Sequence, residues 1–248
     1  MTRKLDRLSL KGMRFDCIVG LREVERTTPQ PVELDVTLHF DTRDAAKLSR
    51  LSQTVDYARL LGELRFILVA SRFRLLESAA EAVAAWLLAP PSQDVPRPQV
   101  EAVDVTLSKL VALSGAAIPS LEIHRVRDDF KLITEHKSFG FVDIIFETKE
   151  CGVYRERIHP RTVLPTHVHH HIDESELVLG DGLLLQGEPV AAGIAHVWPR
   201  GYAHRYENPT DVEQSFLCID RPAFIPTDEV EVDVPLASLK RTEPLRFF

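Results

Sequence analysis

The chain has 248 residues, of which 44% are hydrophobic and 27% are charged. This composition is typical of a soluble globular protein and excludes a disordered chain or a fibre. The formal net charge of -7 argues against a nucleic-acid partner, which normally requires a basic surface.

The given sequence predicts neither a membrane helix nor a signal peptide. The longest nearly uncharged apolar stretch, Ala82–Pro91, has about half of the roughly 20 residues that a membrane helix needs. Met1–Arg7 carries charges where a signal peptide would need an apolar core. The widely spaced Cys17, Cys151 and Cys218 suggest neither a disulfide framework nor a cysteine-based zinc site. We therefore expect a cytoplasmic protein without a membrane partner that acts on small molecules.

The two halves of the chain differ in charge and in histidine content. Residues 1–128 contain 18 Lys/Arg and 17 Asp/Glu, whereas residues 129–248 contain 12 and 20. Eight of the ten histidines follow residue 128, and four of them lie between His167 and His171. We predict a first domain at 1–128, a linker at 129–139, and a second domain with a C-terminal tail at 140–248.

The first half has the pattern of an α+β domain. Residues of alternating polarity predict strands, and apolar residues at intervals of three and four predict helices. In chain order these segments are strands at Leu8–Phe15 and Val32–Phe40, helices at Tyr57–Val69 and Leu75–Leu88, and strands at Val100–Lys109 and Ile118–Val126. They predict an antiparallel four-stranded sheet with two helices on one face. Open sheet edges favour pairing with another copy, so we expect a closed ring of subunits.

The second half is predicted to be almost free of helix. Short apolar runs separated by Gly, Pro, Asn and Asp indicate a β-sandwich or small barrel; they are Val142–Phe146, Gly152–Ile158, Glu176–Leu179, Leu183–Gln186, Ala195–Trp198 and Gln214–Ile219. Arg127–Lys137 is polar and is expected to be a connector. The acidic residues after Ile225 (Asp228, Glu229, Glu231 and Asp233) are expected on the surface or against a neighbouring subunit.

The histidine cluster predicts a metal site. His167 and His169 are two residues apart, so both imidazoles lie on one face of a strand. Glu174 follows, and a later segment, Gly193-x5-Pro199-x-Gly201-x2-His204-x3-Asn208, supplies a third imidazole. Three imidazoles and one carboxylate suit Mn, Fe, Ni, Co or Zn. A shifted set, His169, His171 and Glu176, has the same H-x-H-x4-E spacing; we favour the first set, with the shifted set as the alternative.

These spacings resemble the two motifs of the cupin superfamily. The segment from Gly193 to Asn208 matches every fixed position of the second motif, and His167, His169 and Glu174 match the core of the first. The resemblance implies an all-β barrel that holds a divalent transition metal. It does not choose a reaction, because cupins include enzymes of several classes as well as mere binders.

The first half resembles the dihydroneopterin aldolase family over about residues 4–126. The resemblance lies in four stretches that occur in the order and spacing of the family, namely L-S-L-K-G-M-R-F at 8–15, G-L-R-E-V-E-R at 20–26, T-V-D-Y-A at 54–58 and L-L-E at 75–77. It implies a tunnelling fold, a tetramer or octamer, and active sites between neighbouring subunits. The activity it implies is retro-aldol cleavage of 7,8-dihydroneopterin, or a close relative, to 6-hydroxymethyl-7,8-dihydropterin and glycolaldehyde, without a cofactor.

Five site residues follow from this resemblance. Lys109 matches the catalytic lysine of the family, Tyr57 its catalytic tyrosine, and Glu25 a glutamate that contacts the substrate together with the lysine. Glu77 matches the carboxylate that accepts two hydrogen bonds from the pterin, and Leu76 stands beside it.

Two functions therefore remain open. In the first, the chain is an aldolase of folate biosynthesis with an added metal-binding cupin. In the second, the first half is a scaffold that binds a pterin or purine without turnover, and the cupin carries a metal-dependent reaction or senses a ligand. The feature that distinguishes them is whether the loop after Lys109 lets the amine reach a pterin.

Overall fold

The computed structural model describes residues 5–248, so that residues 1–4 at the start of the predicted first domain lie outside it. The chain forms two compact units. The first takes the chain up to Pro91 and Pro96–Lys131, and the second takes Ser92–Val95 and Leu132–Phe248. An α+β unit followed by an all-β unit confirms the predicted fold class.

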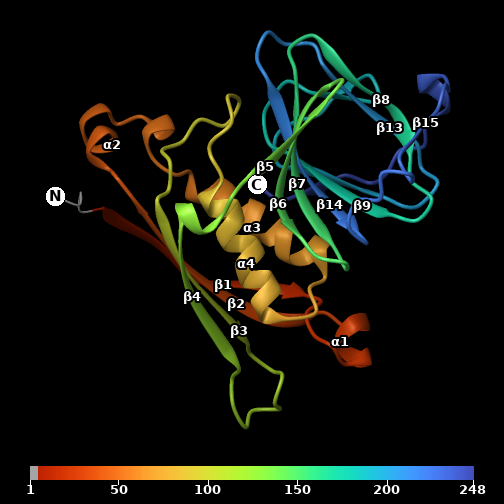
Figure 1. Cartoon of the computed structure of the whole chain (residues 1–248). Helices are drawn as coiled ribbons and strands as arrows, with labels where there is room; N and C mark the ends of the chain where they lie inside the picture. The colour runs from red at the N-terminus through yellow and green to blue at the C-terminus, as the bar shows by residue number, and fades with distance from the viewer. Residues whose placement is uncertain (1–4) are drawn as a thin grey trace. The chain divides into compact units, whose positions relative to one another are not determined.

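The first unit is built on one antiparallel sheet (Figure 1). Its strands are β1 (Asp6–Cys17), β2 (Gln30–Phe40), β3 (Ala102–Lys109) and β4 (Ser120–Val126), and they lie in this order. Strand β1 has an irregular register between Leu10 and Met13, where Gly12 has a φ of 68°. The two edges of this sheet are β1 and β4.

Two helices, α3 (Tyr57–Ser71) and α4 (Leu76–Leu88), cover one face of this sheet. Their apolar positions are buried against alternate residues of the strands; Leu64, Ile67, Val83, Leu34 and Leu107 are each 0% exposed. The side chain of Asp56 begins α3 by accepting hydrogen bonds from the backbone amides of Ala58 and Arg59. This N-cap fixes Tyr57 in the first turn of the helix.

Three short helical elements in the first 53 residues were not predicted from the sequence. They are α1 (Glu23–Thr27), α2 (Arg43–Leu48) and a 3-10 turn at Leu51–Gln53. None of them contains a buried residue, so they lack the apolar periodicity by which a helix is found in a sequence.

The second unit contains two sheets (Figure 1). The five-stranded sheet has the order β11 (Glu188–Pro189), β10 (Leu184–Leu185), β13 (His204–Asn208), β8 (Thr162–Val168), β15 (Val230–Glu231). The seven-stranded sheet has the order β16 (Leu245–Arg246), β12 (Ile194–Trp198), β9 (Asp173–Val178), β14 (Gln214–Arg221), β7 (Gly152–Ile158), β6 (Gly140–Glu147), β5 (Ile133–Lys137). Residues of both sheets, among them Leu164, Tyr206, Tyr154 and Phe216, form one buried core.

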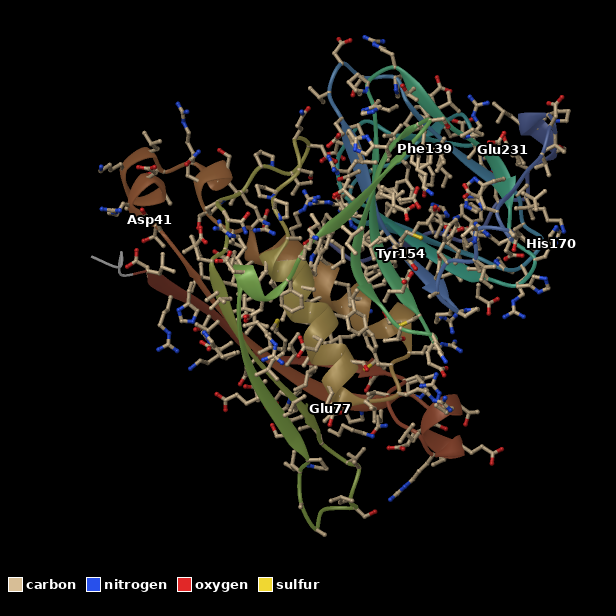
Figure 2. The ribbon with its side chains drawn as sticks, viewed as in Figure 1. Asp41, Glu77, Phe139, Tyr154, His170 and Glu231 are labelled. Carbon is tan, nitrogen blue, oxygen red and sulfur yellow. The ribbon has the colours of Figure 1, made fainter. Side chains whose placement is uncertain are left out.

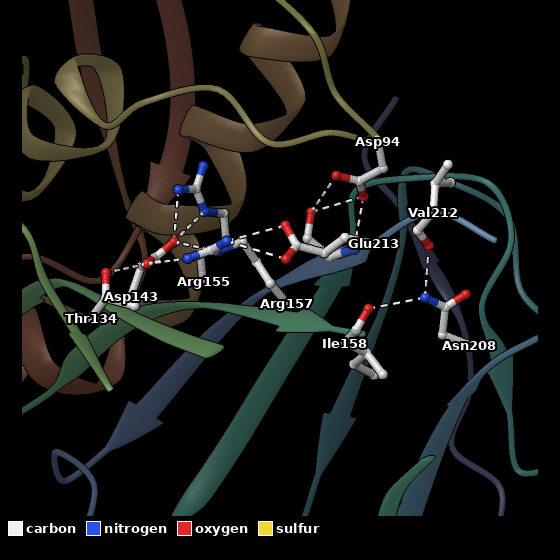
Figure 3. Close-up of polar contacts among 10 residues, drawn as sticks. Asp94, Thr134, Asp143, Arg155, Arg157, Ile158, Asn208, Val212 and Glu213 are labelled. Carbon is white, nitrogen blue, oxygen red and sulfur yellow. Dashed lines mark hydrogen bonds and ion pairs between the residues drawn. The ribbon is translucent and has the colours of Figure 1, made fainter. Parts of the chain in front are cut away.

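Strand β5 corrects the expectation that Arg127–Lys137 is a connector. It pairs with β6 from Ile133 to Lys137. Its polar sequence is tied down by the buried carboxylate of Asp143, which accepts hydrogen bonds from Thr134 Oγ1 at 2.7 Å and from the guanidinium groups of Arg155 and Arg157 at 2.7–3.0 Å (Figure 3). An edge strand held by polar contacts carries no apolar run, so the sequence does not reveal it.

The tail after Ile225 also differs from the expectation. Asp228 is 3% exposed and Glu229 lines a cavity of the second unit, whereas Glu231 and Asp233 are exposed, as expected. Within the described residues, no helix has the length and apolar character needed to cross a membrane.

Candidate functional sites

The first candidate site is centred on an ion pair at the end of β3. Lys109 is the last residue of that strand and is 9% exposed. Its Nζ donates a hydrogen bond to Glu25 Oε1 in the short helix α1. This hydrogen bond lowers the pKa of Glu25 to about 2. The two residues are 84 positions apart in the sequence, and the fold brings them into direct contact.

The loop before α1 is shaped around the carboxylate of Glu25. Its Oε2 accepts a hydrogen bond from the backbone amide of Arg22 at 3.0 Å. Gly20 has a φ of 146°, and a Cβ atom there would overlap the side chain of Glu25. Arg26 Nη1 donates to the carbonyls of Arg72 and Phe73 at the end of α3, at 2.7 and 3.1 Å. The motif at 20–26 therefore holds the glutamate in place.

A groove of about 280 Å³ opens beside this pair. Glu25 and Gln30 line one part of it, and Val111 and Ala112, which follow Lys109, line another. Gln30 is 9% exposed and donates from Nε2 to the carbonyl of Val19 at 2.7 Å. The groove gives a small molecule access to the carboxylate of Glu25.

Glu77 and Leu76 belong to the same end of the unit. Figure 2 shows Glu77 at the end of α4 that lies nearest to α1. Its side chain is exposed in the first turn of α4, where the helix dipole favours a carboxylate. Leu76 lines a small apolar pocket together with Cys17, Val19 and other residues of the core. The fold thus gathers four of the five residues that the aldolase resemblance predicts.

Tyr57 lies apart from these four. It begins α3 and is 64% exposed, whereas Arg72 and Phe73, which contact Arg26, follow the other end of that helix. A helix of 15 residues is about 22 Å long. Within one copy of the chain, Tyr57 therefore does not meet Lys109.

The second candidate site is formed by the predicted metal ligands. His167, His169, Glu174 and His204 are all at most 5% exposed. His204 Nε2 lies 2.9 Å and His169 Nε2 lies 3.6 Å from Glu174 Oε2, and the rings of His167 and His204 are 4.3 Å apart. His167, His169 and Glu174 present ligand atoms within 4.8 Å of one another. Strands β8, β9 and β13 bring His167, Glu174 and His204 together, and His169 joins them from the turn that follows β8.

The outer ring nitrogens of these histidines are held by the protein. His167 Nδ1 faces the carbonyl of Pro165 at 2.9 Å, and His204 Nδ1 faces that of Tyr202 at 3.3 Å. A hydrogen bond from Nδ1 to a carbonyl leaves Nε2 as the basic nitrogen. His204 Nε2 and Glu174 Oε2 are buried and make no hydrogen bond of good geometry. Buried ligand atoms that face one another at 2.9 Å in this way fit a divalent metal ion.

The shifted set is not brought together. His171 is exposed, as is His170 (Figure 2), because both lie in the turn between β8 and β9. Glu176, by contrast, is 1% exposed, lies 3.7 Å from His204 Nε2 and accepts a hydrogen bond from Trp198 Nε1. Glu176 is therefore a neighbour of the first set.

Electrostatics in this cluster favour a cation. Burial opposes the charging of His204, but Glu174 and Glu176 raise its pKa to about 9. Burial and the neighbouring His204 lower the pKa of His167 to about 3. Burial and the Glu174 carboxylate raise the pKa of Glu176 to about 7. A proton on His204 occupies the position in which a metal ion would be held by the same groups.

Comparison with known proteins identifies the first unit. The sequence model of the dihydroneopterin aldolase family matches residues 8–124. A probable dihydroneopterin aldolase from Synechocystis sp. is 30% identical over 84 residues, which cover 34% of this chain and 71% of that protein. The chain belongs to the dihydroneopterin aldolase family.

Solved structures are also similar to parts of this chain. E. coli dihydroneopterin aldolase in complex with neopterin is 28% identical, with a TM-score of 0.44, covering 48% of this chain and 98% of that one. The capsular polysaccharide assembling protein CapF from Staphylococcus aureus is 20% identical, with a TM-score of 0.37, covering 42% of this chain and 35% of that one.

In this member of the dihydroneopterin aldolase family, sequence reasoning misses several residues that support the sites. Trp198 stacks on the ring of His204 at 4.6 Å. Asp228 accepts hydrogen bonds from the backbone amides of His170, His171 and Ile172, at 2.9–3.1 Å. Asp228 is distant in sequence from the histidines that it supports, so no local motif reveals it. Trp198 directly precedes the fixed Pro199 of the second cupin motif, and this position in the sequence could have indicated that it lies near the site.

Proposed function

We propose that the first unit cleaves 7,8-dihydroneopterin, or a close relative, to 6-hydroxymethyl-7,8-dihydropterin and glycolaldehyde. The observation that carries this proposal is the half-buried ion pair of Lys109 with Glu25, at the same end of the unit as Glu77. Membership of the family supports it.

In this proposal one residue binds the pterin and others transfer protons. Glu77 binds the 2-amino group and N3 of the pterin through its two carboxylate oxygens, a planar pairing that a single carboxylate can make. Retro-aldol cleavage needs a base for the side-chain hydroxyl and an acid that returns a proton to carbon, while the pterin ring accepts the electron pair. Lys109 carries these proton transfers, assisted by Tyr57, and Glu25 holds the amine of Lys109 in position.

The site is completed by a second copy of the chain. Tyr57 lies at the opposite end of the unit from Lys109, so a complete set needs Tyr57 from a neighbouring subunit. Large apolar side chains are exposed at both ends, with Leu21, Val24 and Val111 near the ion pair and Leu48 and Leu51 before Tyr57. Exposed apolar groups and the two open sheet edges favour assembly. We propose a homo-oligomer, a tetramer or octamer, with shared sites.

The second unit is proposed to bind a divalent transition metal. Three imidazoles, from His167, His169 and His204, and the carboxylate of Glu174 would hold the ion. Mn, Fe, Ni, Co and Zn each accept this donor set. When bound, such an ion supplies Lewis acidity or redox chemistry at the wall of the neighbouring cavity. Glu176 and Trp198 orient His204.

The test is an assay of product formation from 7,8-dihydroneopterin, with and without a strong chelator. We expect 6-hydroxymethyl-7,8-dihydropterin from the wild type in both conditions. Lys109→Ala should reduce the rate by at least about 100-fold, since general acid and base catalysis contributes that much. Lys11→Ala, which removes an exposed lysine of β1, should leave it unchanged. Absence of product from the wild type would refute the aldolase proposal for this substrate.

The four converging donors also favour a second candidate function. In it, the first unit binds a pterin or purine without turnover, and the metal site of the second unit carries the reaction or senses a ligand. This alternative predicts no glycolaldehyde and an activity that chelator or His204→Ala removes. Chelator-resistant cleavage that depends on Lys109 would exclude it as the main function.

A further inference from the structure

A cavity of about 260 Å³ lies inside the second unit, next to the predicted metal ligands. His167, His169 and Glu174 form part of its wall. A second part is apolar and consists of Phe139, Val142, Ile144, Tyr154, Leu164, Phe224 and Pro226. Figure 2 shows Phe139 and Tyr154 within this unit. The cavity is large enough for a small organic molecule with an apolar body.

Three carboxylates of this wall lack strong hydrogen-bond donors. Among the described residues, Glu156 and Glu229 make no hydrogen bond or ion pair, and Asp220, which is 2% exposed, accepts only from the thiol of Cys218 at 3.4 Å. The three are close enough to interact electrostatically. Asp220 is buried, and Glu156 and Glu229 are half-buried. Withdrawing a carboxylate from water without a strong donor is costly, and a bound ligand with donor groups would relieve that cost.

The other charged groups of the wall are satisfied. Lys137 Nζ pairs with Glu135 at 2.8 Å, and Glu147 accepts a hydrogen bond from the hydroxyl of Tyr154 at 2.6 Å. Lys137 attracts Glu229 electrostatically, but among the described residues it makes no hydrogen bond or ion pair with Glu156, Asp220 or Glu229.

A metal ion at the neighbouring site does not remove the excess of acidic groups in the cavity wall. A divalent ion held by neutral imidazoles and Glu174 adds one net positive charge, but burial and neighbouring carboxylates raise the pKa of Glu156, Asp220 and Glu229, and a cationic group in contact with them would favour their charged form. In the sheet, Asp220 of β14 is paired with Glu174 of β9, so the carboxylate excess begins beside the ion. An anionic ligand entering the cavity would meet repulsion, while a cation would gain charge-assisted hydrogen bonds.

We propose that this cavity binds a small organic cation, a primary amine with an apolar body. Its ammonium group contacts Glu156, Asp220 and Glu229, and its apolar part packs against Phe139, Val142, Ile144 and Phe224. The ligand then lies next to the metal ligands. This proposal is independent of the aldolase activity of the first unit.

The test uses three probes with a common phenylalkyl body and different charges. Binding of 2-phenylethylamine, 2-phenylethanol and phenylacetate to the full-length, metal-loaded protein is measured by calorimetry. We expect the amine to bind at least about tenfold tighter than the alcohol, and phenylacetate to bind most weakly. The same order is expected in metal-free protein, so a failure of metal binding is distinguishable from a failure of this proposal.

Variants locate the binding in the cavity. Glu156→Gln and Asp220→Asn, each nearly isosteric, should weaken amine binding about tenfold and leave the alcohol unchanged. Glu243→Gln removes an exposed carboxylate outside the cavity wall and should have no effect. Thermal unfolding of each variant verifies that it is folded. Equal binding of the three probes, tighter binding of phenylacetate, no binding of the amine, or amine binding unaffected by both substitutions would overturn the proposal.

Discussion

The pKa of Glu25 depends on its contact with Lys109. The hydrogen bond from Lys109 lowers its pKa to about 2, from an ordinary value of 4.5. A depressed pKa stabilises the folded state at every pH above the ordinary value. That stabilisation is lost as the pH falls from about 4.5 towards 2, because the unfolded chain binds the proton first.

Replacement of Glu25 by Gln should therefore have a pH-dependent effect. Near neutral pH we expect Glu25→Gln to lower the free energy of unfolding by about 1–2 kcal/mol, with the full shift reduced by solvent screening. The difference from the wild type should shrink below pH 4.5 and vanish near pH 2. Urea unfolding at a series of pH values measures it, and a difference that stays constant down to pH 2 would contradict the assignment.

Gly20 offers a steric test of the same position. A methyl group there would overlap the side chain of Glu25, and the backbone has a φ of 146°. Gly20→Ala should displace Glu25 from Lys109, destabilise the unit by about 1–3 kcal/mol and reduce aldolase activity.

Gly12 provides the matched control for this substitution. It also has a positive φ, of 68°, but a Cβ atom there meets nothing within 4 Å. Gly12→Ala should carry only the strain of its backbone, and the rate of product formation per folded protein should not change. Equal loss of activity in the two variants would indicate that the space over Gly20 is irrelevant to the site.

At the scale of elements, the turn between β8 and β9 positions the predicted metal ligands. It carries His169 and precedes Glu174, and Asp228 binds three of its backbone amides. Asp228 Oδ2 also lies 3.7 Å from His169 Nδ1. The segment containing Asp228 therefore supports the site from a distant part of the chain.

Asp228→Asn should weaken metal binding while leaving the four ligands intact. We expect a loss of about 10–100-fold in affinity for Zn²⁺ or Mn²⁺, the range typical of residues that orient metal ligands. Competition with a chromogenic chelator measures it, and Asp211→Asn, at an exposed carboxylate, is the control. Unchanged affinity would mean that Asp228 stabilises the turn without orienting His169.

Elements with a regular apolar periodicity were predictable from the sequence, including β4, which has no buried residue, whereas elements without such a periodicity were not. The alternation in β2 and the apolar spacing in α4 correspond to buried faces. Strand β5 and helix α1 have no such face, since polar contacts of Asp143 and Arg26 hold them or their neighbours in place. Periodicity reports burial, so elements fixed by long-range polar contacts escape it.

The candidate sites likewise contain residues that the sequence could indicate and residues that only the fold brings together. Local spacing selects the histidine segment but fits both His167, His169 and Glu174 and the shifted set, and only the fold, in which His171 is exposed, separates them. The pairing of Glu25 with Lys109 depends on contacts between distant segments, and here only the resemblance to a known family indicated it. Asp228 belongs to no local motif, and Glu176 belongs only to the shifted set, so their contacts with the site come from the folded structure.

At the scale of the whole molecule, the central claim is that Lys109 and Tyr57 of different subunits form one aldolase site. The direct measurement is activity on 7,8-dihydroneopterin of oligomers assembled by co-expression of Lys109→Ala and Tyr57→Phe. Each variant alone should be nearly inactive. In mixed oligomers, some interfaces join an intact Lys109 to an intact Tyr57, so we expect activity well above that of either variant.

The wild type and each variant assembled alone are the controls for this measurement, and equal oligomer size by light scattering verifies assembly. Recovery of activity in the mixed oligomers is the result that shared sites require. If the mixed oligomers are no more active than the two variants alone while the wild type is active, the site is contained within one subunit and the account is wrong.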